Sequence, residues 1–159
     1  MLFSISCSSQ VKENKVFFGS DVLVSEKIDL FKNKKIGLVV NQASVLSNGT
    51  SLLETLKTLR INITTIFAPE HGFTGNLADG ESVLSGVTHG GINIYSLYGE
   101  TKKPTPEMLQ NLDVILFDLQ DVGVRFYTYI STMFYVMQAA AENDKQVIIL
   151  DRPNPISGN

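Results

Sequence analysis

The run Lys35-Ile36-Gly37-Leu38-Val39-Val40 decides the fold. It is short, continuously apolar and rich in β-branched side chains, as is typical of a strand buried on both faces of a sheet. Four further runs of this kind follow it along the chain, at 62–67, 92–97, 114–119 and 146–150. Strands buried on both faces occur in parallel sheets that helices cover on both sides. The sequence therefore predicts an α/β fold.

Helical signals lie between most of these strands. Ser51 and Glu54 have the spacing of a capping box ahead of a leucine-rich helix. Thr105 followed by Pro106 is typical of a helix start. Two more helices are predicted, at 22–31 and from about 127 to 142. The second carries one apolar face, formed by Ile130, Met133, Phe134, Met137, Ala140 and Ala141. We expect the two methionines of this face to lie in the core.

The order of these elements predicts a Rossmann-like parallel sheet with right-handed crossovers and helices on both faces. A long Gly-rich loop, about 68–91, follows the second strand. The chain has 159 residues, 43% of them hydrophobic, which suffices for one core without metals or disulfides. The polypeptide stops in a Pro-rich loop directly after a buried strand, so we expect the sheet to be incomplete.

Composition excludes several classes of protein. The net charge of −3 argues against nucleic acid or an anionic membrane as the main partner. No apolar run is long enough to span a membrane, and a single cysteine excludes an internal disulfide. Neither a dinucleotide-binding Gly-x-Gly-x-x-Gly motif nor a Walker lysine is present, and the two histidines lack metal-ligand spacing. We therefore expect no cofactor and no metal.

Residues 1–15 have two interpretations. A short apolar stretch, Cys7 and two serines resemble the end of a bacterial lipoprotein signal, in which the cysteine receives the lipid anchor. The apolar part is too short for a complete signal, and no basic segment precedes it. The alternative is a disordered start with an incidental thiol.

Polar residues follow all five predicted strands. Ligands of open parallel sheets bind beyond the carboxyl ends of the strands, so these residues are candidates for one site. In chain order they are Asn41 and Gln42; Glu70 and His71; Tyr98; Asp118, Gln120, Asp121, Arg125 and Tyr127; and Asp151 and Arg152.

Glu70 is the sharpest candidate. It leaves a buried strand among apolar neighbours, where desolvation raises the pKa of a carboxyl and suits it to act as a general acid, with His71 beside it. The alternative is a solvated loop glutamate. Asp118 and Asp121 fit a metal ligand, a catalytic carboxylate or a helix cap. Arg125 and Arg152 fit either a substrate anion or ion pairs with aspartates.

Six motifs in the same order resemble the NamZ-type exo-β-N-acetylmuramidases, and they cover roughly 17–158. The six segments are 37–42, 67–73, 96–99, 103–109, 117–129 and 150–155. The resemblance implies a bacterial glycoside hydrolase that releases N-acetylmuramic acid from the non-reducing end of peptidoglycan fragments. It also implies that residues 16–159 are the N-terminal part of a Rossmann-like catalytic domain, with the remainder and an auxiliary domain absent.

For the site, the resemblance implies that Glu70 is the catalytic acid. Glycoside hydrolysis also needs a second carboxylate, or assistance from the substrate's own acetamido group. Asp118, Asp121 and Asp151 are equal candidates for that carboxylate. The lactyl carboxylate of muramic acid needs a cation, for which Arg125 and Arg152 are available, and Tyr98 and Tyr127 are suited to contact the sugar.

The resemblance places the protein in the bacterial cell envelope, periplasmic or secreted, with muropeptides or disaccharides as partners. Two alternatives stay open. One is a non-catalytic muropeptide-binding fragment. The other is a metal-assisted hydrolase that uses Asp118, Asp121 and Asp151.

Overall fold

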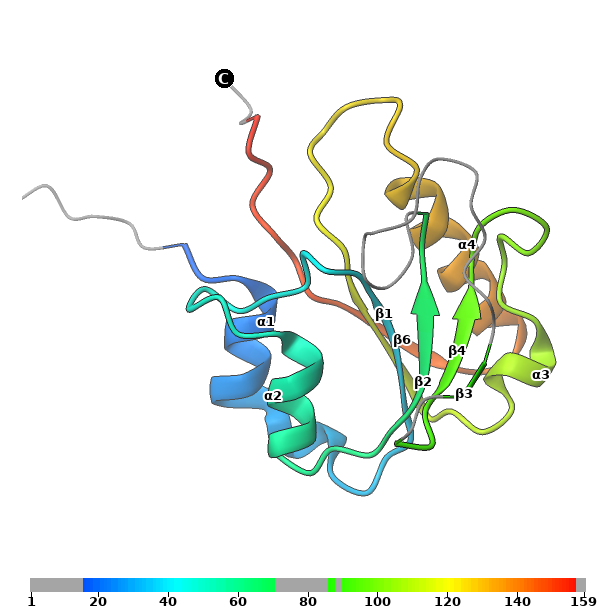
Figure 1. Ribbon diagram of the computed structural model, residues 1–159, viewed down its shortest axis with the longest axis horizontal. Coiled ribbons are helices and arrows are strands. Elements are labelled where there is room, and N and C mark those ends of the chain that lie inside the picture. The colour runs from blue at the N-terminus through cyan, green and yellow to red at the C-terminus, as the bar shows by residue number, and fades with distance from the viewer. Residues whose placement is uncertain (1–15, 71–85, 88–89, 157–159) are drawn as a thin grey trace, which may run out of the picture.

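The computed structural model describes residues 16–70, 86–87 and 90–156. Its centre is a six-stranded sheet in the order β3-β4-β2-β1-β5-β6 (Figure 1). Cys7 and His71 lie outside the described residues. The strands are β1 (Ile36–Val40), β2 (Ile63–Ala68), β3 (Gly86–Val87), β4 (Asn93–Ser96), β5 (Val114–Asp118) and β6 (Gln146–Ile149).

All five predicted strands are present and parallel to one another, which confirms the predicted α/β class. The sixth, β3, lies within the stretch expected as a loop and pairs antiparallel with β4 at the edge of the sheet. Two residues are too few to show a periodic pattern in the sequence, so this edge strand was not predicted.

The helices also follow the prediction closely. Ahead of β1, three short segments form one continuous helical run: α1 (Gly19–Val22), a π-helical turn (Leu23–Lys27) and a 3₁₀ turn (Ile28–Phe31). The remaining helices are α2 (Leu52–Thr58), α3 (Pro106–Leu109) and α4 (Tyr129–Glu142). The Ser51 hydroxyl accepts a hydrogen bond from the Glu54 amide, as a cap should, whereas the Glu54 carboxylate pairs with Lys57.

The helices form two layers, with α1 and α2 on one face of the sheet and α3 and α4 on the other (Figure 1). Each layer encloses its own core. Leu38 of β1 packs with Leu52 and Leu56 of α2 on the first face. On the second face, Phe67 and Phe117 of the sheet pack with side chains of α4. A sheet buried on both sides explains why its central strands are apolar throughout.

The apolar face predicted for α4 is only partly the buried one. Thr132, Val136, Ala139 and Ala140 face the sheet, and Met133 is partly buried against it. Ile130, Phe134 and Met137 are instead exposed, by 54%, 62% and 46% of their surface. The expectation that Met137 lies in the core was therefore wrong. Small side chains let the helix approach the sheet closely, so the larger ones face outward.

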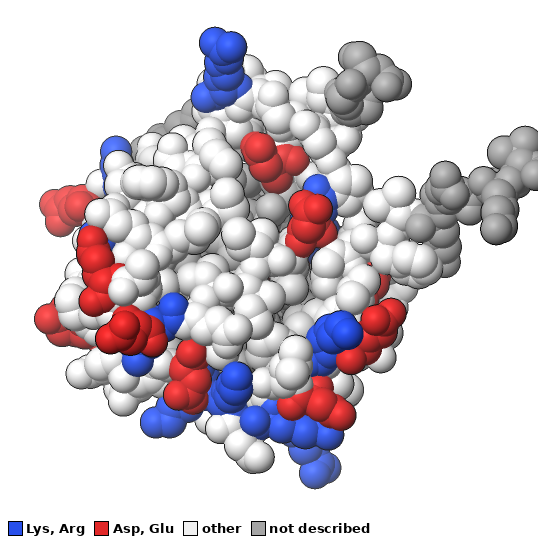
Figure 2. Space-filling model, turned by 180° about the vertical axis from the view of Figure 1, so that it is seen from behind, with Lys and Arg blue, Asp and Glu red and all other residues white. Residues whose placement is uncertain are grey.

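Charged side chains are unevenly spread over the molecular surface. On the face shown in Figure 2, most of them gather along the lower rim, beneath the amino ends of the strands, and the centre is largely uncharged. Among the described residues, no helix is both long and apolar enough to cross a membrane.

Candidate functional site

The start of α4 joins the carboxyl ends of two neighbouring strands. Thr128, the residue directly before α4, donates a hydrogen bond from its hydroxyl to Oε2 of Glu70 at 2.8 Å. The next residue, Tyr129, accepts a hydrogen bond on its hydroxyl from Nδ2 of Asn41 at 3.0 Å. Glu70 follows β2 and Asn41 follows β1. Two of the predicted strand-end residues are thus held by consecutive residues of one helix start.

Glu70 opens into a pocket of about 190 Å³. Pro69 beside it is buried, and Glu70 itself is half-buried. The pocket combines a carboxylate, an ammonium group, several hydroxyl groups and one apolar wall, and is lined by Glu70, Leu97, Tyr98, Lys102, Thr128, Ser131, Thr132 and Tyr135. Such a set can bind a polar ring through its hydroxyls and present one acid to it.

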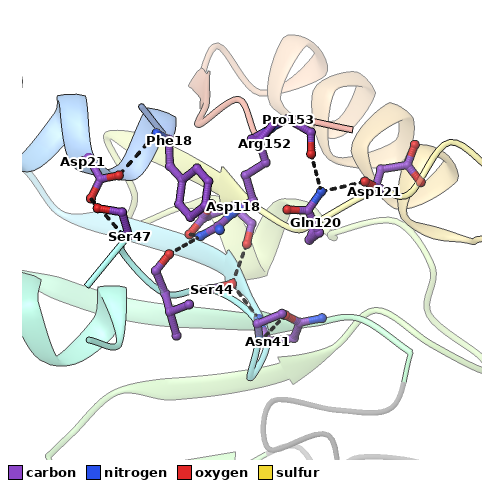
Figure 3. A network of polar contacts seen from close by, with 12 residues as sticks. Phe18, Asp21, Asn41, Ser44, Ser47, Asp118, Gln120, Asp121, Arg152 and Pro153 are labelled. Carbon is purple, nitrogen blue, oxygen red and sulfur yellow. Dashed lines mark hydrogen bonds and ion pairs between the residues drawn. The ribbon is translucent and has the colours of Figure 1, made fainter. Parts of the chain in front are cut away.

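The strand order reverses between β1 and β5, and a buried ion pair lies at this switch point. Nε and Nη2 of Arg152 donate to Oδ1 and Oδ2 of Asp118 at 2.6 and 2.8 Å (Figure 3). Nη2 also donates to the carbonyl oxygen of Val45 at 2.8 Å. The two side chains are 0% and 4% exposed, Asp118 being the deeper. Of the two uses predicted for Arg152, the ion pair with an aspartate is present.

Neighbouring groups hold this pair in place. The Ser44 hydroxyl donates to the backbone oxygen of Asp118 and accepts from the amide of Asn41. The guanidinium of Arg152 lies 5.1 Å from the centre of the Phe18 ring, within cation–π range. Burial raises the pKa of the Asp118 carboxyl above its ordinary value, and the hydrogen bonds and charge of Arg152 offset this only in part.

A second pocket of about 180 Å³ lies between α4 and the end of β6, and Asp121, Asp151 and Arg152 line it together with Tyr129. Oδ1 of Asp121 is buried and has no hydrogen-bond partner among the described residues. Gln120 fixes this edge through its amide, which donates to the carbonyl oxygens of Asp121 at 2.7 Å and Pro153 at 3.1 Å (Figure 3).

The predicted metal alternative finds no support in this geometry. Within residues 16–70, 86–87 and 90–156, no three side chains of histidine, cysteine, aspartate or glutamate form a group that could hold a metal ion. Asp118, Asp121 and Asp151 therefore do not form one. Asp118 is instead bound on both oxygens by Arg152.

The remaining predicted site residues lie on exposed loops near the carboxyl ends of the strands. Gln42 and Arg125 are exposed, on the loops after β1 and before α4. Tyr127 is 36% exposed, and its ring lies edge-on to that of Tyr129 with 5.5 Å between ring centres. Burial raises the pKa of the Tyr129 hydroxyl, opposed by its hydrogen bond from Asn41. The structure thus gathers Glu70 and Tyr98 in one pocket and Asp121, Asp151 and Arg152 in another.

Several residues of the Glu70 pocket were missed from sequence. Thr128 lies within a motif that was singled out, but its hydroxyl next to charged and aromatic residues carried no distinct signal. Lys102 follows the third predicted strand by a few residues, where one more polar loop residue is unremarkable. Ser131 and Tyr135 lie on a helix expected to serve the core. The start of α4, beside the ends of β1 and β2, brings Thr128, Ser131 and Tyr135 to Glu70, and the loop after β4 brings Lys102.

Comparison with known proteins shows which family the chain resembles. Residues 36–159 match the family model described as exo-beta-N-acetylmuramidase NamZ, N-terminal. The chain is 47% identical over 156 residues to the peptidoglycan beta-N-acetylmuramidase NamZ of Bacillus subtilis (strain 168). That alignment covers 97% of this chain and 38% of the relative, so the chain spans well under half of the relative's length.

Two solved structures share the fold. Both are DUF1343 family proteins from Bacteroides fragilis NCTC 9343, at 42% and 37% sequence identity. Their TM-scores are 0.78 and 0.70, and each match covers 89% of this chain and 36% of the other. The predicted resemblance is therefore confirmed.

Proposed function

The chain belongs to the family of the N-terminal domain of exo-β-N-acetylmuramidase NamZ, and we propose that it carries the catalytic acid of such an enzyme. The substrate would be a peptidoglycan fragment with N-acetylmuramic acid at its non-reducing end, and the product free N-acetylmuramic acid. These partners imply a place in the bacterial cell envelope. The relative at 47% identity carries the corresponding activity in its name.

The observation that supports this proposal most directly is the setting of Glu70. One carboxylate oxygen, Oε2, accepts the hydrogen bond of Thr128, which fixes the orientation of the group in the pocket. The other oxygen, Oε1, is then the one to carry a proton toward a bound sugar. A general acid needs this combination of fixed orientation and access to substrate.

The reaction follows from these positions. Glu70 gives its proton to the glycosidic oxygen as the bond from that oxygen to C1 of the muramic acid breaks. The positive charge that develops on the sugar ring is relieved by a nucleophile at C1, and water finally supplies the new hydroxyl. The departing sugar keeps the proton that Glu70 gave, and the attacking water returns a proton to the Glu70 carboxylate, so atoms and charge balance.

The second group in this proposal is the acetamido oxygen of the substrate. Among the described residues that line the pocket, Glu70 is the one carboxylate. Asp121 and Asp151 line the neighbouring pocket, and Asp118 is buried against Arg152. Substrate assistance needs no second carboxylate beside the acid, which is why the pocket favours it.

Turnover of a chromogenic N-acetylmuraminide, measured beside calorimetry with N-acetylmuramic acid, tests the proposal. We expect the wild-type chain to bind and hydrolyse, and Glu70→Gln to bind with similar affinity but lose about 10²-fold or more in kcat. Glu107→Gln, on the exposed surface of α3, is the matched control and should retain full activity.

Two outcomes would contradict the proposal that the chain is an enzyme with Glu70 as its acid. Binding without turnover in the wild type would favour the alternative of a muropeptide-binding module. Turnover at the wild-type rate in Glu70→Gln would show that another group is the acid.

A further inference from the structure

Two charged side chains face the Glu70 pocket without neutralising each other. Glu70 and Lys102 both line it, yet the carboxylate of Glu70 is bound by the hydroxyl of Thr128. None of the described residues forms an ion pair with Lys102, whereas Nζ of the adjacent Lys103 pairs with Glu142 at 2.5 Å. The pocket therefore contains an ammonium group that forms no ion pair with a carboxylate of the described residues.

The two arginines expected to bind the substrate's anion are not in this pocket. Both oxygens of Asp118 and the Val45 carbonyl engage the guanidinium of Arg152 at the switch point. Arg125 is exposed on the loop before α4 and is not among the residues that line the Glu70 pocket. Among the described residues that line this pocket, Lys102 is the one cation.

The first turn of α4 adds to the positive character of this wall. Ser131 and Thr132 belong to that turn of a 14-residue helix, and both line the pocket. The amino end of a helix carries a partial positive charge, which favours a nearby anion. A carboxylate between Lys102 and this turn would meet an ammonium group and the hydroxyl of Ser131 together, whereas the hydroxyl of Thr132 already donates to the carbonyl oxygen of Thr128.

We propose that Lys102 determines the specificity of this site by binding the lactyl carboxylate of N-acetylmuramic acid. This inference rests on the proposed function and extends it. N-acetylglucosamine is the same sugar without the lactyl ether, so it lacks the charge that Lys102 would bind. The hydroxyls and Leu97 contact features that the two sugars share, and Lys102 contacts the feature that differs.

The test compares affinities for the two sugars in the 159-residue chain, by calorimetry at fixed ionic strength. We expect Lys102→Met to weaken binding of N-acetylmuramic acid about tenfold or more, because a hydrogen bond between charged groups is lost. Binding of N-acetylglucosamine should stay within about twofold. Lys102→Arg keeps the charge and should retain most of the preference.

Lys103→Met and Arg125→Met are the controls, and neither should change the ratio of the two affinities. Lys102 is exposed, so its replacement should leave the thermal unfolding midpoint unchanged, which is checked in the same samples. An unchanged ratio in Lys102→Met, with a wild type that prefers N-acetylmuramic acid, would overturn this inference alone. A loss of preference in Arg125→Met would move the role to Arg125. A wild type that binds neither sugar would contradict the proposed function itself.

Discussion

The guanidinium of Arg152 gives Asp118 the hydrogen bonds that burial takes away. A carboxylate that is 0% exposed has lost its water, and two short contacts from one planar group replace it. Such a pair contributes little net stability when intact, because both partners must be desolvated. Removing one partner is a different matter, since it leaves the other charge buried without compensation.

We therefore expect Arg152→Met, which leaves the Asp118 carboxylate buried without a partner, to lower the free energy of unfolding by about 3–5 kcal/mol. Asp118→Asn removes the charge that burial disfavours, so it should cost less. The double variant should be at least as stable as the less stable of the two single variants, because no unpaired charge remains. Denaturant unfolding measures all three. The exposed pair of Asp29 and Lys32 is the control, and Asp29→Asn should cost less than about 1 kcal/mol. Additive effects of the two single changes would refute this account.

The pH dependence of stability reports on the same carboxyl. Its pKa is raised above the ordinary value of 3.8 by burial. The folded state then binds the proton more tightly than the unfolded state does. This contribution to stability is full below pH 3.8 and is lost as the pH rises through the raised pKa. Measured against Asp118→Asn, the wild type should lose stability over that window. If the wild type instead gained stability relative to Asp118→Asn as the pH rises, the hydrogen bonds and charge of Arg152 would affect the pKa of Asp118 more strongly than burial does.

At the level of elements, α1 is tied to the segment that carries Arg152. The amide of Gly19 donates to the carbonyl oxygen of Asp151 at 2.7 Å. A Cβ on Gly19 would lie 2.5 Å from the backbone nitrogen of Asp151 and 2.7 Å from the backbone of Leu150. These are main-chain atoms on a strand end, so they cannot move aside as a flexible side chain would.

Gly19→Ala should therefore lower the free energy of unfolding by about 1–3 kcal/mol, the usual range for overpacking. Urea unfolding monitored by circular dichroism gives the value. Glu26→Ala, on the exposed side of the same helical run, is the matched control and should change it by less than about 0.5 kcal/mol. A Gly19→Ala protein as stable as this control would show that α1 can separate from the strand end without cost.

On the scale of the whole molecule, the second face is closed by a helix that keeps its larger apolar side chains outside. Ile130, Phe134 and Met137 follow one another at helical spacing and are all about half exposed or more. Ile149 at the end of the edge strand β6 is 44% exposed. An apolar stripe of this kind is a surface that binds other apolar molecules.

The 159-residue chain should accordingly bind a hydrophobic fluorescent dye in its folded state. Replacing Ile130 and Phe134 together by serine should reduce the bound-dye fluorescence several-fold, without lowering stability by more than about 1 kcal/mol, since neither side chain is in the core. Gln138→Ser, on the exposed side of the same helix, should leave the fluorescence unchanged. Equal dye binding by the double variant would contradict a role for this stripe.

The sequence by itself determined the five parallel strands and the edge of the sheet at which the polar residues gather, but not the antiparallel edge strand β3. Apolar runs such as Ile36–Val40 depend on local composition, and a right-handed crossover leaves little choice of direction. The packed side of α4 was not determined, because Val136 and Ala139 differ from Phe134 and Met137 mainly in size. The preference for small residues arises only when a helix meets a sheet.

The partners of the charged groups were likewise decided by tertiary structure. From sequence, Arg152 was equally suited to a substrate or an aspartate, and Lys102 was one loop lysine among others. The contact of Arg152 with Asp118 joins residues 34 positions apart, and that of Thr128 with Glu70 joins residues 58 apart. Side chains this far apart meet only through the order of the strands and the path of α4. That arrangement commits Arg152 to the interior and places Lys102 beside Glu70.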